Sequence, residues 1–440
     1  MHTGPKLSLR SGNLPLWIAM VVFAVLVLPT QCLAQGQKLP HYKVVDLGTL
    51  GGTFSGAEDD APNQSGQTDG YSTLPGDNVT HAFLWSRGSM IDLGTLGGPN
   101  SMAVWELNDW GAVPVQSDTT TLDPNAEDYC FLDSGTSYIC RAFVWYQGLK
   151  ITLPPLDGNN SYGAQINNQG QMVGASELDV PNPTCPPRQG SGYSQVLIER
   201  PVIWEQGRVT ELPILPSDTS GAAFVINDQG QIGGFSSPDC ATNNWHLWLY
   251  DHGAQIHLGS LGGQALNIPQ AINNKTQVVG GSDLSGDTVN HAFLWEKGAM
   301  RDLGTLSGYP NSIALGINDE GQVVGGASNE PFLGGNSSAF LWQDGVMTDL
   351  NTLIPADSPL FLWWATGINS HGQITGQAVQ VSTGEWHAFL ATPVEKESGV
   401  AFASGETRER PTVTMPENVR KLLQRRTRFG GFKEELAVPQ

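Results

Sequence analysis

The 440-residue chain has few charged side chains, and most of those it has are acidic. It contains 22 Lys and Arg against 42 Asp and Glu, which gives a formal net charge of −20 at pH 7. Nucleic-acid binding depends on basic side chains that neutralise phosphates, so this balance argues against a DNA or RNA partner. Charged residues make up 15% of the chain, against ~25% in ordinary soluble proteins, which argues against long solvated helices.

Long apolar runs are also scarce after the first 34 residues. Lys6 and Arg10 precede a 15-residue apolar run from Leu14 to Leu28, and Cys32-Leu33-Ala34 offers small residues at a cleavage site. The run is shorter than the ~18–20 residues of a membrane-spanning helix. We therefore expect residues 1–34 to be a signal peptide cleaved after Ala34. The mature chain should be exported, extracellular or periplasmic, with no transmembrane segment.

The five cysteines show no CxxC pair, and no paired histidines at zinc-ligand spacing accompany them. Four remain after signal removal, an even number that favours disulfides in an exported protein: Cys130, Cys140, Cys185 and Cys240. Pairing Cys130 with Cys140 and Cys185 with Cys240 requires the least reach, although two other pairings stay open. We expect no metal and no cofactor. Calcium is the lesser alternative, because acids cluster at 58–60 and 283–287 without the ligand ladder of an EF-hand.

Glycine, by contrast, is abundant at 53 residues, and the chain repeats itself. A His-Ala-Phe-Leu-Trp element stands at 81–85 and 291–295, and degenerate copies follow the same plan. An asparagine, often preceded by isoleucine, recurs seven times at spacings of 45 to 60 residues: Asn63, Asn108, Asn167, Asn227, Asn273, Asn318 and Asn369. Internal repeats of this length are typical of propellers and solenoids.

Each copy contains four strand-like runs, which we name a to d in chain order. Tight turns with Asn, Asp and Gly join a to b and c to d. Runs c and d carry apolar residues on both alternating faces, which predicts strands buried on both sides. Four strands in about 45 residues match one blade of a β-propeller.

The two ends of the repeat region complement one another. The first run, Tyr42–Leu47, is a strand d without a, b or c, and the last, His387–Leu390, is a strand c without d. Pairing them completes a seventh blade and removes two exposed edges. The sequence therefore predicts an all-β, seven-bladed propeller over residues 40–393, closed by its N-terminal strand.

These repeats resemble the bacterial extracellular repeat proteins of the HAF family, named for the His-Ala-Phe tripeptide. The resemblance covers residues 42–393 and is strongest in the fifth and sixth copies. It implies export and a repeat fold, and it brings no established activity or catalytic residue. The recurring histidines are accordingly expected to be structural.

Strand order places the a–b and c–d turns on one face of the ring and the b–c and d–a connections on the other. The long irregular segments 117–140, 176–199 and 236–245 are all b–c connections, and variable loops on a rigid scaffold often bind ligands. Aromatic anchors concentrate there: Tyr129, Phe131, Tyr138, Tyr193 and Trp245. We predict a secreted binding or scaffold protein that recognises a protein or glycan through this face. The alternative is a polysaccharide hydrolase or lyase with acids at the axial channel, for which no catalytic residue is assigned.

Residues 394–440 form a separate, slightly basic tail. They hold nine Lys and Arg and seven Asp and Glu, whereas residues 35–393 hold 11 bases and 35 acids. We expect a mostly disordered extension with one short basic helix near 417–429, which suits contact with an anionic surface.

Overall fold

The computed structural model describes residues 39–394 except 58–60, 128, 131–136, 185–195, 239–243 and 332–334, together with Met1, His2 and Gly4. Met1–Leu39 is a unit of its own, and the fold below belongs to the unit from Pro40 onward. The predicted signal peptide and the tail beyond Val394 lie outside the described residues, apart from the three at the N-terminus. Among the described residues, no helix has the length and apolar character needed to cross a membrane.

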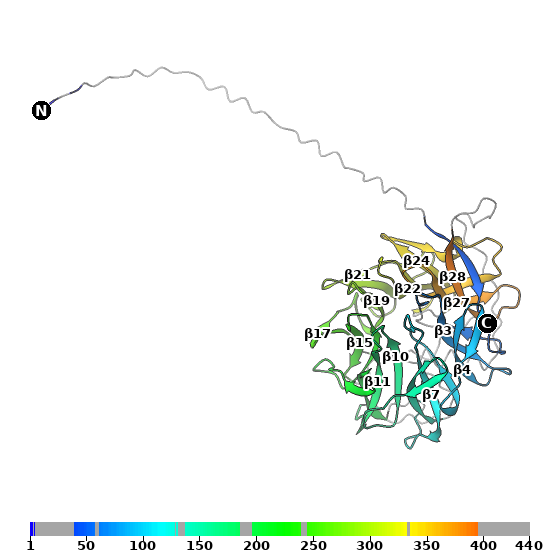
Figure 1. Ribbon diagram of the computed structural model, residues 1–440. Coiled ribbons are helices and arrows are strands. Elements are labelled where there is room, and N and C mark those ends of the chain that lie inside the picture. The colour runs from blue at the N-terminus through cyan, green and yellow to red at the C-terminus, as the bar shows by residue number, and fades with distance from the viewer. Residues whose placement is uncertain are drawn as a thin grey trace. The chain divides into compact units, whose positions relative to one another are not determined.

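Seven four-stranded antiparallel sheets make up the described chain, which confirms the seven-bladed β-propeller (Figure 1). One short 3-10 helix, η2 (Leu350–Thr352), follows the sixth blade. Blades 1 to 3 are built from β2 (Ser55–Gly56), β3 (Thr68–Thr73), β4 (Thr80–Ser86) and β5 (Ser89–Asp92); β6 (Gly97–Met102), β7 (Val113–Leu122), β8 (Tyr138–Tyr146) and β9 (Leu149–Thr152); and β10 (Ser161–Ile166), β11 (Met172–Pro181), β12 (Leu197–Glu205) and β13 (Arg208–Glu211).

Blades 4 to 6 follow the same order, and blade 7 combines both ends of the described chain. Their strands are β14 (Ser220–Ile226), β15 (Ile232–Ser237), β16 (His246–Asp251) and β17 (Ala254–His257); β18 (Gly262–Ile272), β19 (Val278–Leu284), β20 (Asn290–Glu296) and β21 (Ala299–Asp302); β22 (Asn311–Ile317), β23 (Val323–Ser328), β24 (Ser337–Gln343) and β25 (Val346–Asp349); and β26 (Leu360–Ile368), β27 (Ile374–Gln380), β28 (Trp386–Val394) and β1 (His41–Asp46).

The predicted closure is confirmed. β1 pairs antiparallel with β28 along its whole length, from His41 opposite Val394 to Asp46 opposite Phe389 (Figure 1). The N-terminal strand thus supplies strand d of the blade that the C-terminal strands begin. The backbone N–H of Leu47 continues this contact by donating to the carbonyl of Ala388 at 3.0 Å.

The prediction that strand d is buried on both sides is wrong. Most residues of strands a to c are buried, as in β3, β10 and β15, whereas the four-residue strands β5, β9 and β13 are mostly exposed. Strand d is the outermost strand of each blade, so one of its edges and much of its surface face solvent. Its apolar residues, such as Leu149 and Ile151, are 65% and 51% exposed.

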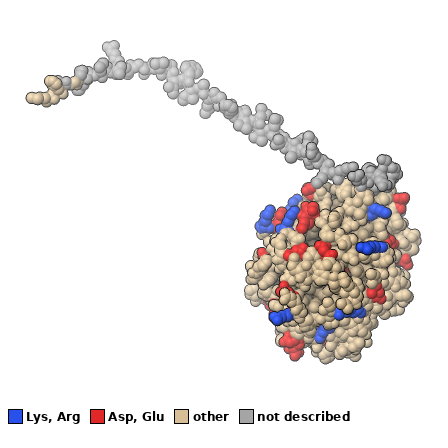
Figure 2. Space-filling model, in the orientation of Figure 1, with Lys and Arg blue, Asp and Glu red and all other residues tan. Residues whose placement is uncertain are grey.

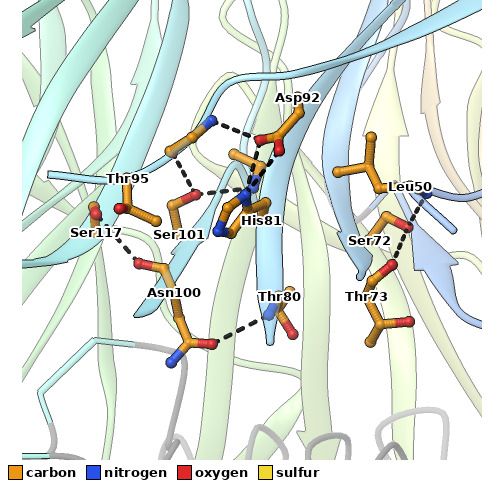
Figure 3. Close-up of polar contacts among 12 residues, drawn as sticks. Leu50, Ser72, Thr73, Thr80, His81, Asp92, Thr95, Asn100, Ser101 and Ser117 are labelled. Carbon is orange, nitrogen blue, oxygen red and sulfur yellow. Dashed lines mark hydrogen bonds and ion pairs between the residues drawn. The ribbon is translucent and has the colours of Figure 1, made fainter. Parts of the chain in front are cut away.

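The recurring sequence motifs form contacts between neighbouring blades (Figure 3). The backbone N–H of Ala82, from the His-Ala-Phe element of blade 1, donates to Ser101 Oγ of blade 2 at 3.0 Å. The Ser101 hydroxyl donates in turn to the carbonyl of Gly94 at 2.7 Å. The same pair of bonds joins blades 7 and 1 through Ser55, and blades 5 and 6 through Ser312.

The histidine of the His-Ala-Phe element binds the aspartate of the neighbouring strand d. His81 Nδ1 lies 2.9 Å from Asp92 Oδ1 (Figure 3), and His291 makes the equivalent contact with Asp302. His387 does so with Asp46 at 2.8 Å, which links the two ends of the propeller. This contact accounts for the recurrence of histidine within the fold, without any catalytic role.

Replacing His387 by alanine is expected to lower the free energy of unfolding by about 1–2 kcal/mol, because a charge-assisted hydrogen bond is lost. Burial would raise the pKa of Asp46, but hydrogen bonds from His387 and Gly48 lower it. The carboxylate contribution is therefore present above the ordinary aspartate pKa of 3.8 and is lost as the pH falls through the lowered folded value. Urea unfolding between about pH 2 and 7, a range that includes this loss, measures the effect.

H291A is the matched control, because it removes the same contact within one blade. We expect a similar loss of stability from it. Faster amide exchange along β1, however, is expected for H387A alone, because only that variant loosens the junction of the two ends. Equal β1 exchange in both variants would show that the His387–Asp46 contact does not hold the ring closed.

Candidate functional site: a polar well on the axis

The seven recurring asparagines form a closed ring of hydrogen bonds around the axis. Each side-chain Nδ2 donates to the backbone carbonyl of the asparagine in the next blade, at 2.9–3.2 Å, and Asn369 closes the ring onto Asn63. All seven side chains are buried. Each ring carbonyl also accepts an N–H of its own turn, as Asn318 does from Gly321. The ring is therefore a saturated structural element, and its carbonyls are not free to bind a cation.

The residue after each asparagine forms a second, more exposed ring at the a–b face. Carboxylates and amides alternate through most of it: Gln64, Asp109, Asn168, Asp228, Asn274, Asp319 and Ser370. The alternation lets neighbours bind one another. Asn168 Nδ2, for example, donates to Asp109 Oδ2 at 2.9 Å and to Asp228 Oδ2 at 3.0 Å. We call this second ring the rim.

The rim surrounds a cavity of about 140 Å³, which we call the axial well. The residue before each asparagine lines it as well, so Pro62, Leu107 and five isoleucines contribute apolar surface. One water needs ~10–15 Å³ of such volume, so the well has room for several waters or a small organic group. None of the described residues that line it is basic.

Glu106 lies at the inner end of the well and also lines a smaller chamber below it. Its Oε2 accepts a hydrogen bond from Gln165 Nε2 at 2.6 Å. Burial raises the pKa of Glu106 to about 8, with repulsion from Asp109 and Asp228 adding to the shift and the Gln165 bond opposing it. Glu106 therefore holds a proton at neutral pH, whereas its ordinary pKa is 4.5.

A second acid, Asp69 on β3, is fully buried near Glu106. Burial raises its pKa well above 3.8, the charge of Glu106 adds to this, and the backbone N–H of Leu107 opposes it. Asp69 occupies a strand position that holds Val279 and Val324 in blades 5 and 6. Glu106 at the well therefore has a second desolvated acid, Asp69, as its neighbour in blade 1.

Aromatic rings fill the axis beyond the inner chamber. Trp105 lines the chamber and stacks on Phe224 with ring centroids 5.2 Å apart. These side chains come from blades 2 and 4, which are not neighbours, so they meet across the axis. Phe224 also contacts Phe235, against which Trp245 stacks at 4.1 Å. The well is consequently open at the a–b face and closed below.

The predicted aromatic binding face is therefore corrected at two positions. Tyr129 and Trp245 are 1% and 8% exposed, because they pack against Tyr162 and Phe235 respectively. Tyr138 is half-buried at the start of β8. Phe131 and Tyr193 lie outside the described residues. Tyr129 and Trp245 thus anchor their insertions to the core and do not present an aromatic surface to a ligand.

The disulfide between Cys130 and Cys140 is present, with Cα atoms 5.4 Å apart and both residues buried. Cys185 and Cys240 lie outside the described residues, so their predicted pairing stays a prediction. The insertions partly prolong the blades: β7 and β11 each run for ten residues, against six for β3 and β23.

A buried acid cluster, which the sequence did not reveal, joins the insertions of blades 2 and 3. Asn160 Nδ2 donates to Asp123 Oδ2 and to Glu177 Oε2, each at 2.9 Å. Glu127, in the insertion of blade 2, accepts the backbone N–H groups of Val196 and Leu197 at its Oε1 atom. Val196 and Leu197 stand at the end of the blade 3 insertion and the start of β12. Burial and the neighbouring Glu127 raise the pKa of Glu177 to about 9, while hydrogen bonds from Asn160 oppose the shift.

Within the described ranges, no group of three or more His, Cys, Asp or Glu has the arrangement of a metal site. Asp283 and Asp287 belong to one of the clusters considered for calcium, and Asp287 binds backbone N–H groups instead. Asp283 is buried on β19, and Asp287 Oδ1 accepts the N–H groups of Gln264 and Ala265. The other cluster, residues 58–60, lies outside the described residues.

Charged side chains are sparse on the surface as well. Figure 2 shows Lys, Arg, Asp and Glu scattered over one face of the molecule, separated by broad uncharged areas. No continuous basic patch is present in this view. This agrees with the low charge content and with the absence of a phosphate-binding surface on that face.

No protein-family model matches the sequence, and no curated protein matches it. Solved structures of low identity share the fold. The β-propeller domain of the Trilobed protease from Pyrococcus furiosus is 14% identical, with 66% of this chain and 81% of that chain covered and a TM-score of 0.43. A puromycin hydrolase (12% identity, 78% and 52% covered, TM-score 0.45) and Trypanosoma rangeli sialidase (8%, 80% and 60%, 0.40) are also similar. The chain spans about half the length of the peptidases it matches.

The class of protein that the fold defines is thus a seven-bladed β-propeller with a closed ring. Its candidate site is an acidic axial well lined by polar and some apolar side chains, on the face opposite to the long insertions.

Proposed function

We propose that this chain is an exported binding protein of the HAF-repeat type whose ligand enters the axial well. The observation that carries the proposal is the cavity itself, because its rim, wall and floor come from seven blades that a closed ring holds rigidly. A preorganised concave site of mixed polar and apolar lining is the usual form of a small-ligand site. Export is supported by the apolar N-terminal run and by the Cys130–Cys140 disulfide.

The proposal moves the site from the insertion face to the a–b face. The described parts of the insertions bury their aromatics and tie their acids to one another, so they act mainly as braces between blades. A protein or glycan remains the class of partner that we expect, provided that it projects a small group into the well.

Replacing Ser370 by tryptophan tests the site. Ser370 is an exposed rim residue on blade 7, and a bulky ring there fills the mouth at little expected cost to folding, within about 0.5 kcal/mol. Glycan and peptide arrays should give ligands that bind the wild type and lose at least about tenfold in affinity with S370W. S370A, which keeps the mouth open, is the control. Ligands that bind S370W as tightly as the wild type would place the site elsewhere.

Glu106 gives the enzymatic alternative one observation in its favour. A carboxyl group that stays protonated at neutral pH near a second carboxyl group, Asp109, has the arrangement of a general acid beside a second acid, as glycosidases use. The same arrays, read for released product as well as for binding, test it. We expect binding without turnover. Cleavage that E106Q abolishes would instead establish a hydrolase or lyase.

A further inference from the structure

The axial well is negatively charged and has no basic residue of its own to balance this charge. Three rim carboxylates, Asp109, Asp228 and Asp319, surround the mouth. Each is already bound by backbone or amide N–H groups, as Asp319 is by Asn274 N at 2.8 Å and Nδ2 at 3.2 Å. These bonds hold the carboxylates apart around the ring, each with lone pairs still available to a ligand.

A bare metal ion does not suit this arrangement. A metal needs several ligand atoms at one point, and the described residues show no such group of acids. An anion is disfavoured by the carboxylates. A larger cation that spreads its charge and its donors over several ångströms fits the spacing better.

Two further side chains favour an organic cation. Trp110 follows Asp109 in the same turn, next to the residues that line the well but not among them, and is 45% exposed, held by Tyr146 in an edge-on contact at 5.1 Å. An exposed indole beside a carboxylate is a common environment for ammonium and guanidinium groups. Deeper on the axis, Thr366 Oγ1 lines the inner chamber, is buried, and has no hydrogen-bond partner among the described residues. It offers an acceptor to a donor that reaches past the rim.

We infer that the axial well binds the guanidinium or ammonium group of a peptide side chain, with the rim carboxylates as its counter-ions. This inference rests on the proposed function and names the ligand class of that site. The apolar lining suits the methylene stem of arginine or lysine, while the charged head meets carboxylates. The polar groups of the rim and the closed floor then limit the ligand to one extended side chain.

Binding should also be linked to proton release. Near neutral pH Glu106 is protonated, and a cation in the well favours its ionised form. Affinity is therefore expected to rise with pH up to the Glu106 pKa of about 8 and to level off above it. In the E106Q variant this pH dependence should largely disappear.

The test is calorimetric titration of the full chain with N-acetyl-arginine amide and N-acetyl-lysine amide, in buffers of different ionisation enthalpy. N-acetyl-citrulline amide, the neutral analogue of the arginine probe, is expected to bind at least about tenfold more weakly. D109N, D228N and D319N should each weaken the cationic probes by about three- to tenfold. E320Q, which removes an exposed charge next to Asp319 but outside the well, should leave affinity unchanged.

Equal binding of the citrulline and arginine probes would overturn the inference. So would calcium ions alone binding at the rim with no binding of either cationic probe. If neither probe binds while S370W removes another ligand, the ligand class is wrong and the proposed function stands. If S370W changes no observed binding at all, the proposed function itself is wrong.

Discussion

Replacing Asn369 by alanine is expected to lower the free energy of unfolding by about 3–5 kcal/mol, the largest effect of any single asparagine ring variant. Asn369 Nδ2 donates to the carbonyl of Asn63 at 3.2 Å and to Gln373 Oε1 at 2.9 Å. Its Oδ1 accepts the N–H groups of His371 and Gln373. Truncation removes all four bonds at the junction of the last and first blades, and the Asn63 carbonyl keeps only its bond from the N–H of Gly66. Equilibrium urea unfolding measures the loss.

Replacing Asn369 by aspartate separates the hydrogen-bond acceptor of this side chain from its donors. N369D keeps the acceptor of the turn but loses both donors and places a carboxylate against a carbonyl, so we expect it to be nearly as damaging as N369A. N78A is the control, because Asn78 is exposed and bonds only locally to Gly76. A loss below about 1 kcal/mol for N369A would mean that the ring bonds contribute little.

The blade count and the closure were predictable because they depend on repetition along the chain. The repeat region begins with a strand d and ends with a strand c, which indicated that β1 completes the blade of β28. The Asn-Asp-Gly turns indicated which connections are tight. These are local patterns, and seven copies reinforce each signal. Burial of strand d was mispredicted because the apolar content of a strand does not show whether the strand lies inside a blade or at the outer edge of the blade.

The axial well was not predictable in the same way. The turn residues Asn318 and Asp319 were assigned only to turn formation, yet their partners in neighbouring blades lie 45 or 51 residues away. Asn63 and Asn369 are 306 residues apart. Such contacts exist only once the ring has closed. Three aspartates one position after the recurring asparagine were a usable signal, because any residue there must face the axis in a closed propeller.

The prediction from the insertions of blades 2 and 4 was wrong for another physical reason. Aromatics in an irregular segment were expected to contact a ligand, but Tyr129 packs against Tyr162, and Trp245 stacks on Phe235. An exported domain gains stability by anchoring long connections with buried rings and a disulfide. Sequence composition alone does not distinguish an anchor that faces inward from one that faces outward.

Replacing Glu177 by glutamine is expected to stabilise the protein by about 2–4 kcal/mol at pH 8 and to flatten the dependence of stability on pH. Glu177 is fully buried, and its Oε2 accepts two hydrogen bonds of 2.9 Å from the backbone and side chain of Asn160. A glutamine retains an oxygen for these bonds. In the wild type, Glu177 and Glu127 are joined by a side-chain hydrogen bond. In E177Q the amide N–H₂ of the glutamine supplies the donor for this bond.

The direction follows from the raised pKa. The folded protein holds a proton on Glu177 up to a pKa of about 9, whereas the unfolded chain releases it near the ordinary value of 4.5. The stabilisation is therefore complete below pH 4.5 and is lost progressively as the pH rises towards 9, at up to ~1.4 kcal/mol per pH unit. Urea unfolding of wild type, E177Q and the exposed control E320Q between pH 5 and 9 measures the slope. A wild-type slope retained in E177Q would show that Glu177 is already ionised in the fold, with the nearby Arg141 as its counter-charge.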